Sequence, residues 1–229
     1  MIVVGLTGSI GMGKSTVAAQ FSALGAKTAS ADGFVHQLLA SDKQVFAEIE
    51  QNFPTAILHC HPALVAGSGE TNSASSFITR PRYKNGVTAK YIDRQALGKI
   101  VFADAEKRKI LERILHPRVV ALEEEFGWAQ RRLGAKLLVL DIPLLFETGA
   151  QNRVDYTIVV TAPEFIQRRR VLARAGMSAE KFERIIKTQM PDREKQEKAD
   201  FIVQTGLGKA HSFKQVKQLI NSNACFSMV

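Results

Sequence analysis

A glycine-rich stretch near the start of the chain has the residue types that bind phosphate groups. It runs from Gly8 to Ser15 and fits the phosphate-loop pattern, in which a glycine and four further residues precede Gly-Lys-Ser. Glycines let the backbone curl so that successive N–H groups point at one phosphate. In such loops the lysine, here Lys14, reaches the outer phosphates, and the hydroxyl of Ser15 binds Mg²⁺. The stretch therefore predicts a site for a nucleoside triphosphate with Mg²⁺.

The residues on either side of the loop predict the elements that must hold it. Residues 2–7 form an apolar run of strand length, and Val17, Ala18, Phe21 and Leu24 recur at helical spacing after the loop. A strand, a loop and a helix in this order place the helix N-terminus, with its positive partial charge, against the bound phosphate. This setting favours a phosphate loop over a chance glycine-rich turn.

Two aspartates follow predicted strands and lie where open parallel sheets bind ligands, at the carboxyl ends of the strands. Asp32 comes after the short strand predicted for residues 25–29, and Asp141 ends the apolar run 137–141. An acidic residue placed like Asp141 commonly serves Mg²⁺ beside a phosphate loop. For Asp32 two interpretations stay open: it faces the phosphates, or it caps a helix that begins near Gly33.

Composition limits the class of protein. The chain has 229 residues, of which 45% are apolar, so it has enough material for a large α/β core. No apolar run approaches the roughly 18 residues of a membrane span, and the first strand leaves no room for a signal peptide. The two cysteines, Cys60 and Cys225, show no partner pattern. We therefore expect a cytoplasmic protein without a membrane partner.

Charge and metal-ligating residues narrow the partners further. The net charge of +9 indicates anionic partners. Because the basic residues are scattered without interleaved aromatic residues, we expect polyanionic small molecules and no nucleic acid. His59, Cys60 and His61 suggest a metal site, but three adjacent side chains cannot all reach one ion without strain, and no second ligand cluster has the usual spacing.

The middle of the chain predicts a helical block with an irregular insertion. No hydrophobic period survives between residues 54 and 91; the run 67–76 is small and polar and 80–84 is mostly basic, which is typical of a mobile surface insertion. Around this insertion, Asp42 and Asp93 are predicted to cap helices. The block is too large for a simple crossover between strands, so we expect it to bind a substrate.

A helix break is predicted within this block. Residues 105–115 carry an apolar helical stripe, which His116-Pro117 follows directly. Because proline suits the first turn of a helix, we expect Pro117 to open a second helix that runs to about residue 133.

The last third of the chain predicts strands at 154–160 and 201–203 and a helix that opens at Pro163. Arg170 and Arg174 share one face of that helix, four residues apart. Two guanidinium groups so placed repel each other unless an anion lies beside them. Bound nucleotide is the expected anion.

The neighbouring charges have less specific interpretations. For Arg168 and Arg169 we expect a solvated helix face. The alternative partner for Arg174 is a structural carboxylate, with Glu180 and Glu183 as the candidates.

Several short motifs together resemble the dephospho-coenzyme A kinase family. Leu115-His116-Pro117 and Pro-Leu-Leu-Phe-Glu at 143–147, in this order, are far more specific than the phosphate loop, which many ATPases share. The resemblance covers the chain apart from about residues 58–89. The other matching residues are the segments 5–16, 31–32, 93–97, 101–104 and 141–142, then Gln167, Arg170 and Arg174, and the run Gln189-Met190-Pro191 that leads to Lys195 and Ala199-Asp200.

The resemblance implies the fold class and the domains. The fold would be α/β, a P-loop NTPase with three α/β/α layers, a parallel five-stranded sheet, a helical substrate-binding insertion and a lid. The nucleotide-binding core would be residues 1–32, 134–165 and 199–229. Residues 33–133 would form the helical domain for the coenzyme A substrate, with a flexible insertion near 54–91, and residues 166–198 would form the lid.

The resemblance also implies the activity, which is transfer of the γ-phosphoryl group of ATP, with Mg²⁺, to the ribose 3′-hydroxyl of dephospho-CoA. This is the final step of coenzyme A biosynthesis; we expect a monomer, with an oligomer left open. The implied catalytic residues are Asp32, Lys14 and Arg174. The implied nucleotide-binding residues are Gly8, Ser9, Gly11, Met12, Gly13, Lys14, Ser15, Thr16 and Arg170. The implied substrate-binding residues are Asp32, His116, Pro143, Leu144 and Glu147, and the implied metal ligands are Ser15 and Asp141.

Three features depart from the family pattern. Members often carry Asp-Ala-Asp after the second strand, whereas this chain has Ser30 at the first of these positions. Only Asp32 can then supply the carboxylate that the family uses there. The insertion before Tyr91 is longer than is usual in the family, so the family's substrate contacts in this region cannot be assigned to residues of this chain. Ala175 stands where an aspartate often follows the second lid arginine.

Two rival functions stay open. A kinase of another small hydroxyl compound, such as a nucleoside, would keep the loop and the lid but would leave residues 116–117 and 143–147 together unexplained. A nucleic-acid-binding protein with a phosphate loop is favoured by the net charge of +9. A GTP-binding switch is disfavoured, because the chain has no Asn-Lys-x-Asp guanine motif.

Overall fold

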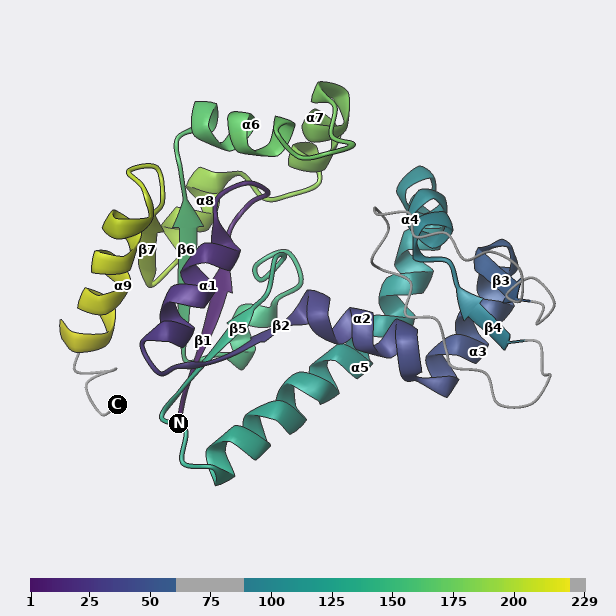
Figure 1. The fold of residues 1–229 in the computed structure, drawn as a ribbon, viewed down its shortest axis with the longest axis horizontal. Helices are drawn as coiled ribbons and strands as arrows, with labels where there is room; N and C mark the ends of the chain where they lie inside the picture. Colours follow the sequence, from purple (N-terminus) through teal and green to yellow (C-terminus); the bar gives the residue numbers. More distant parts are fainter. Residues whose placement is uncertain (61–88, 223–229) are drawn as a thin grey trace, which may run out of the picture. The chain divides into compact units, whose positions relative to one another are not determined.

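The computed structural model describes residues 1–60 and 89–222, which divide into two compact units. The described residues of the first unit are 1–32 and 123–222, and those of the second unit are 33–60 and 89–122. Figure 1 traces the helices and strands of both units. The predicted insertion at 67–76, the basic cluster at 80–84, His61, Cys225 and the side chains of His59 and Cys60 lie outside the described residues.

The first unit is built on a five-stranded parallel sheet, as predicted. The strand order is β2-β5-β1-β6-β7, so the loop that follows β1 stands at the centre of the carboxyl end of the sheet. β5 and β2 lie on one side of β1, and β6 and β7 lie on the other. In open parallel sheets, the point where the strand order reverses in this way is where a ligand crevice opens. The strands are β1 Ile2–Thr7, β2 Lys27–Ser30, β5 Leu137–Asp141, β6 Tyr156–Thr161 and β7 Phe201–Gln204.

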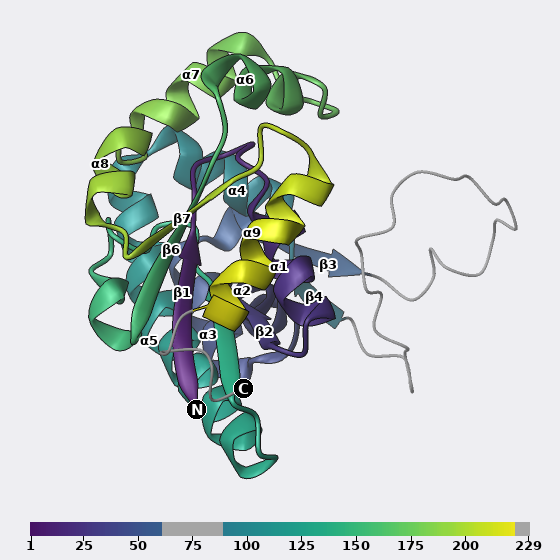
Figure 2. The same ribbon diagram turned by 90° about the vertical axis from the view of Figure 1, so that its left-hand side faces the viewer.

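The helices of the first unit cover the sheet and extend past its carboxyl end. Figures 1 and 2 both show α6 and α7 beyond the end of β6. Of the described helices, none combines the length and the apolarity that a membrane span needs. The helices are α1 Lys14–Ala23, α6 Glu164–Leu172, α7 Ala179–Lys187, α8 Asp192–Lys198 and α9 Lys209–Ser222, with the 3₁₀ helix η3 Ala150–Arg153.

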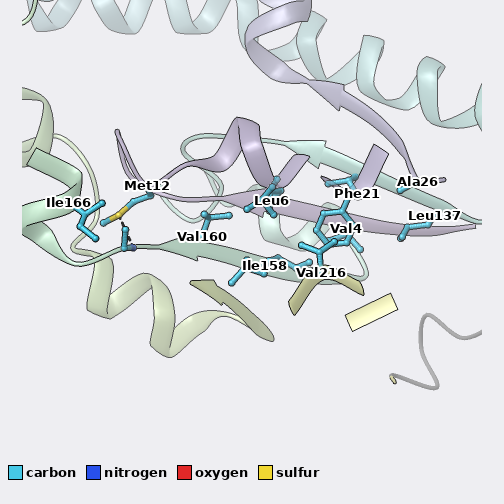
Figure 3. Packing of buried hydrophobic residues seen from close by; sticks show 14 residues of the cluster. Val4, Leu6, Met12, Phe21, Ala26, Leu137, Ile158, Val160, Ile166 and Val216 are labelled. Carbon is cyan, nitrogen blue, oxygen red and sulfur yellow. Dashed lines mark hydrogen bonds between the residues drawn. The ribbon is translucent and has the colours of Figure 1, made fainter. Parts of the chain in front are cut away.

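The two faces of the sheet bury different side chains, because neighbours along a strand point to opposite faces. Val4 and Leu6 of β1 belong to a fully buried cluster with Phe21 of α1 and Val216 of α9. Figure 3 shows these side chains packed together. Leu138 of β5 belongs to a second cluster, on the other face. The loop after β1 therefore starts from a strand that is buried on both faces.

The second unit is helical and contains a small two-stranded sheet. Asp42 and Asp93 cap its helices as predicted, since each carboxylate accepts two backbone N–H groups of the first turn. Its elements are α3 Lys43–Asn52, η1 Pro54–Ala56, β3 Ile57–Cys60, β4 Ala89–Ile92 and α4 Arg94–Ala103, together with most of α2 Ala31–Ser41 and the first part of α5 Ala105–Arg132.

The prediction of no regular structure between residues 54 and 91 is wrong at both ends of that stretch. β3 and β4 pair antiparallel, with Ile57 opposite Ile92. Each strand has only four residues, too few to show an alternating pattern, and the two partners are far apart in the sequence. No local signal marks either strand.

The predicted helix break at residues 116–117 is also wrong, because α5 runs through Pro117 as one helix. Proline removes one backbone donor and crowds the carbonyl one turn earlier, at a cost of roughly 3 kcal/mol in a helix interior. Tertiary packing offsets this cost: Ile114, Leu115 and Val119, on either side of the proline, are at most 8% exposed.

Candidate functional site

The phosphate loop passes from β1 to α1 through positions that require glycine. Gly11 and Gly13 have φ angles of 80° and 93°, a backbone conformation that side chains disfavour. A Cβ on Gly8 would lie 2.6 Å from Val160 O, and one on Gly11 would lie 2.5 Å from Val171 Cγ2. The close approach of the loop to β6 and α6 therefore fixes the path of its backbone.

Side chains from other parts of the chain donate hydrogen bonds to carbonyl groups of the loop. Gln167 Nε2 donates to Ile10 O at 2.8 Å, and Thr205 Oγ1 donates to Met12 O at 2.5 Å. Arg170 lies behind the loop, with Nη1 donating to Met12 O at 3.4 Å and Nη2 to Thr205 O at 2.8 Å. These three side chains turn the carbonyls outward, away from the inner side of the loop.

Several backbone N–H groups of the loop remain available to bind a phosphate. Within residues 1–60 and 89–222, no hydrogen bond is formed by the N–H groups of Gly11, Gly13, Lys14 and Ser15. They stand at the N-terminus of α1, where unpaired donors and the helix dipole attract anions. The side chain of Met12 is 3% exposed and packs in the core (Figure 3), and its N–H donates to Ser9 O at 3.1 Å.

Three charged side chains interact at the carboxyl end of the sheet. Lys14 Nζ forms an ion pair with Asp141 Oδ1, and both side chains are at most 15% exposed. Burial raises the pKa of Asp141 above its ordinary value; the paired Lys14 opposes this rise, and the charge of Asp32 adds to it. The loop lysine and the two predicted carboxylates therefore act on one another electrostatically.

One of the two interpretations of Asp32 is wrong. The helix α2 begins at Ala31, two residues before the expected Gly33, so Asp32 lies inside the first turn and not at the capping position. The strand β2 passes into α2 without a connecting turn, which moves the helix start forward. Asp32 is exposed, and its orientation toward phosphate stays a prediction.

The predicted metal ligands are close to the loop. In the part of the chain that the structure describes, no group of three or more His, Cys, Asp or Glu side chains is placed to hold a metal ion. Mg²⁺ usually takes one or two carboxylates and fills its shell with waters and substrate phosphates. Asp141 and the exposed Ser15, in the first turn of α1, fit this pattern.

The segment after β5 is tied to both β1 and α8. Thr7 Oγ1 donates to Pro143 O at 3.0 Å. Glu147 Oε1 lies 2.8 Å from Lys195 Nζ and accepts Met190 N at 2.8 Å. Burial would raise the pKa of Glu147, but the hydrogen bonds from Lys195 and Met190 lower it below its ordinary value. The carboxylate of Glu147 therefore has partners within the protein.

The two predicted nucleotide-binding arginines have different surroundings. The expectation that they share one helix face is wrong, because α6 ends at Leu172 and Arg174 follows it. Arg170 is held behind the loop, whereas Arg174 is exposed and forms no ion pair with any described residue. Glu183, one alternative partner of Arg174, pairs instead with Arg168 at 2.7 Å. Arg168 and Arg169 are exposed on α6, as expected, and Arg168 also lies 5.8 Å from the ring of Phe182.

The remaining predicted residues lie in several places. His116 is exposed on α5 and belongs to the second unit. Leu144 is half-buried after β5, and Ser9 is 6% exposed within the loop. Thr16 is half-buried in the first turn of α1.

Two residues that contact the loop have no role among the predictions from sequence. Thr205 follows β7, and the rule that ligand-binding groups follow parallel strands would have found it. Gln189, between α7 and α8, accepts Ile10 N through Oε1 at 3.1 Å. This contact joins residues 179 apart in the sequence, so no local pattern marks it.

A cavity of about 170 Å³ lies away from these residues. Its lining residues include Met1, Val3 of β1, Leu138 of β5 and Trp128 of α5. Val3 and Leu138 lie near the amino ends of β1 and β5, whereas the loop follows the carboxyl end of β1. The cavity holds none of the phosphate-binding groups, so the loop is the candidate site.

Comparisons with known proteins agree with the motifs. A family model described as dephospho-CoA kinase matches residues 2–65 and 78–209. A dephospho-CoA kinase of Rhizobium meliloti is 42% identical over 222 residues, which cover 97% of this chain and 96% of that protein. A dephospho-CoA kinase of Bartonella quintana is 40% identical over 222 residues, covering 97% and 98%.

Two solved structures also resemble the chain. The protein TT1252 of Thermus thermophilus has a TM-score of 0.73 and 30% identity, with 96% of each chain covered. A dephospho-CoA kinase of Campylobacter jejuni has a TM-score of 0.62 and 29% identity, again with 96% of each chain covered.

The fit of the loop against α6 generates a prediction for Gly11→Ala. The new Cβ would collide with Val171, and we expect the nucleotide-induced rise in melting temperature to disappear along with turnover. Gly25→Ala is the matched control, because Gly25 also has a positive φ, 95°, but a Cβ there meets no atom within 4 Å. Equal losses of nucleotide response in both variants would contradict the account. Thermal melts with and without ATP and Mg²⁺ make the comparison.

Proposed function

Because the chain belongs to the dephospho-CoA kinase family, we propose that it transfers the γ-phosphoryl group of ATP to the ribose 3′-hydroxyl of dephospho-CoA, giving coenzyme A and ADP. The observation that carries the proposal is the loop itself: free N–H groups at the start of α1 stand beside Lys14, within reach of Asp141. Such a site neutralises and positions a polyphosphate, which is most of what phosphoryl transfer needs.

In this reaction Lys14 has two partners in turn. It pairs with Asp141 in the structure, and when ATP binds we expect its ammonium group to turn to the β- and γ-phosphate oxygens. Mg²⁺, held by Ser15 and Asp141 together with phosphate oxygens, would supply further charge neutralisation. The loss of its lysine partner leaves the Asp141 carboxylate free to serve as that ligand.

Asp32 is the proposed partner of the attacking hydroxyl. It is exposed in the first turn of α2, and its negative charge contributes to the raised pKa of Asp141. A ribose hydroxyl is a poor acid, so Asp32 first orients the group and accepts its proton late, as the phosphoryl group transfers. General-base assistance of this kind contributes roughly 10²–10⁴-fold to the rate.

The other predicted residues complete the proposal. Residues 1–32, 134–165 and 199–229 hold the nucleotide; residues 33–133 hold dephospho-CoA; and residues 166–198 act as the lid. We propose that His116, Pro143 and Leu144 contact dephospho-CoA, and that Arg174 closes over the phosphates. The exposed and unpaired state of Arg174 among the described residues supports this role. A cytoplasmic location, a monomeric state and the lack of a nucleic-acid partner stay predictions.

A coupled assay of ADP release tests the proposed function directly. The purified chain, with ATP and Mg²⁺, is offered dephospho-CoA or one of a panel of nucleosides and nucleotides. We expect dephospho-CoA to give by far the highest kcat/KM and to gain one phosphate at the 3′ position by mass spectrometry. Comparable turnover of a nucleoside, or no response to dephospho-CoA, would refute the proposal.

The role of Asp32 generates a second prediction. Asp32→Asn keeps the shape and removes the charge, so kcat should fall by about 10²–10⁴-fold while ATP affinity barely changes. Glu106→Gln is the control, because it removes a carboxylate from the first turn of another helix, α5. Steady-state kinetics and thermal melts are the measurements. Normal kcat together with a lowered melting temperature would show that Asp32 only stabilises α2.

A further inference from the structure

The backbone of Ile10 is held on both sides by glutamine side chains. Gln189 Oε1 accepts its N–H at 3.1 Å, and Gln167 Nε2 donates to its carbonyl at 2.8 Å. We propose that Gln189 is a positioning residue for ATP: it fixes the phosphate loop from the connection between α7 and α8. The inference rests on the proposed function and names a residue of the same site that touches the loop and not the reacting atoms.

The two glutamines differ in what else they do. Gln167 is 5% exposed within α6, so its side chain also fills space in the packed interior. Gln189 is only half-buried, between two helices. Its side-chain bond to Ile10 is therefore the contact that can be removed without opening the core.

The connection that carries Gln189 is itself firmly anchored. Met190 N donates to Glu147 Oε1 at 2.8 Å, and the same oxygen lies 2.8 Å from Lys195 Nζ. Lys195 is fully buried and the Glu147 side chain is 18% exposed, so salt screens this ion pair less than a surface pair. The lowered pKa of Glu147 keeps its carboxylate charged at neutral pH. Gln189 thus reaches the loop from a fixed point, tied to the segment after β5.

A glycine-rich loop needs such a restraint. The loop has glycine at 8, 11 and 13, and glycine loses more conformational freedom on ordering than any other residue. Without an external bond, the Ile10 N–H would be free to leave its place, and ATP would have to order the loop as it bound. A bond formed before ATP arrives lowers that cost, which appears as tighter binding.

The test compares two substitutions in the same connection. Gln189→Met keeps the length of the side chain and removes the acceptor for Ile10 N. Thr188→Ala is the control, because the Thr188 hydroxyl donates only to Ile185 O, within its own helix end. ATP affinity is measured by calorimetry with Mg²⁺ and no acceptor, and KM for each substrate and kcat are measured by ADP release. Melting temperatures are recorded for both variants.

Loss of one hydrogen bond to the loop should weaken ATP binding by about three- to tenfold in Gln189→Met. KM for ATP should rise by the same factor, while KM for dephospho-CoA stays within about twofold and Thr188→Ala behaves as wild type. Unchanged ATP affinity would overturn the inference. So would an equal rise of both KM values with a lowered melting temperature, which would indicate general loosening. If the wild type binds ATP but does not phosphorylate dephospho-CoA, the proposed function fails, and calorimetry still tests the role of Gln189.

Discussion

A loop that binds a polyanion through its N–H groups must keep its own carbonyls away from that anion. In this chain the requirement is met by three side chains on the protein side of the loop. Gln167, Arg170 and Thr205 donate hydrogen bonds to the outward-turned carbonyls of Ile10 and Met12. These donors come from α6 and from the residue that follows β7. Because a buried carbonyl without a partner is costly, these donors stabilise the one backbone path that leaves N–H groups facing inward.

The same arrangement explains why residues far from the loop matter to it. The helix α6 supplies Gln167 and Arg170, and the connection after α7 supplies Gln189, so the region expected to act as the lid also supports the loop. Arg174, exposed after the end of α6, is the arginine that we expect to respond to bound nucleotide.

Local sequence patterns predict the central strands and the phosphate loop, but not the long-range contacts that hold the loop in place. The loop, the buried strands and Asp141 follow from spacing, and the caps Asp42 and Asp93 follow from residue type. The helix break expected at Pro117 is wrong, because tertiary packing outweighs a local helix breaker. The strands β3 and β4 and the bond from Gln189 depend on partners distant in sequence, which a single sequence does not reveal.

The most direct test of the central claim is a nuclear magnetic resonance titration of the backbone amides with ATP and Mg²⁺. The account predicts that the amide protons of Gly11, Gly13, Lys14 and Ser15 move downfield as they bond to phosphate. The amide of Ile10, already bonded to Gln189, should change little. The account is contradicted if the resonances of these four amides do not shift while ATP binds, or if the Ile10 resonance shifts as much as they do. The loop would then not hold phosphate in the way its hydrogen bonds indicate.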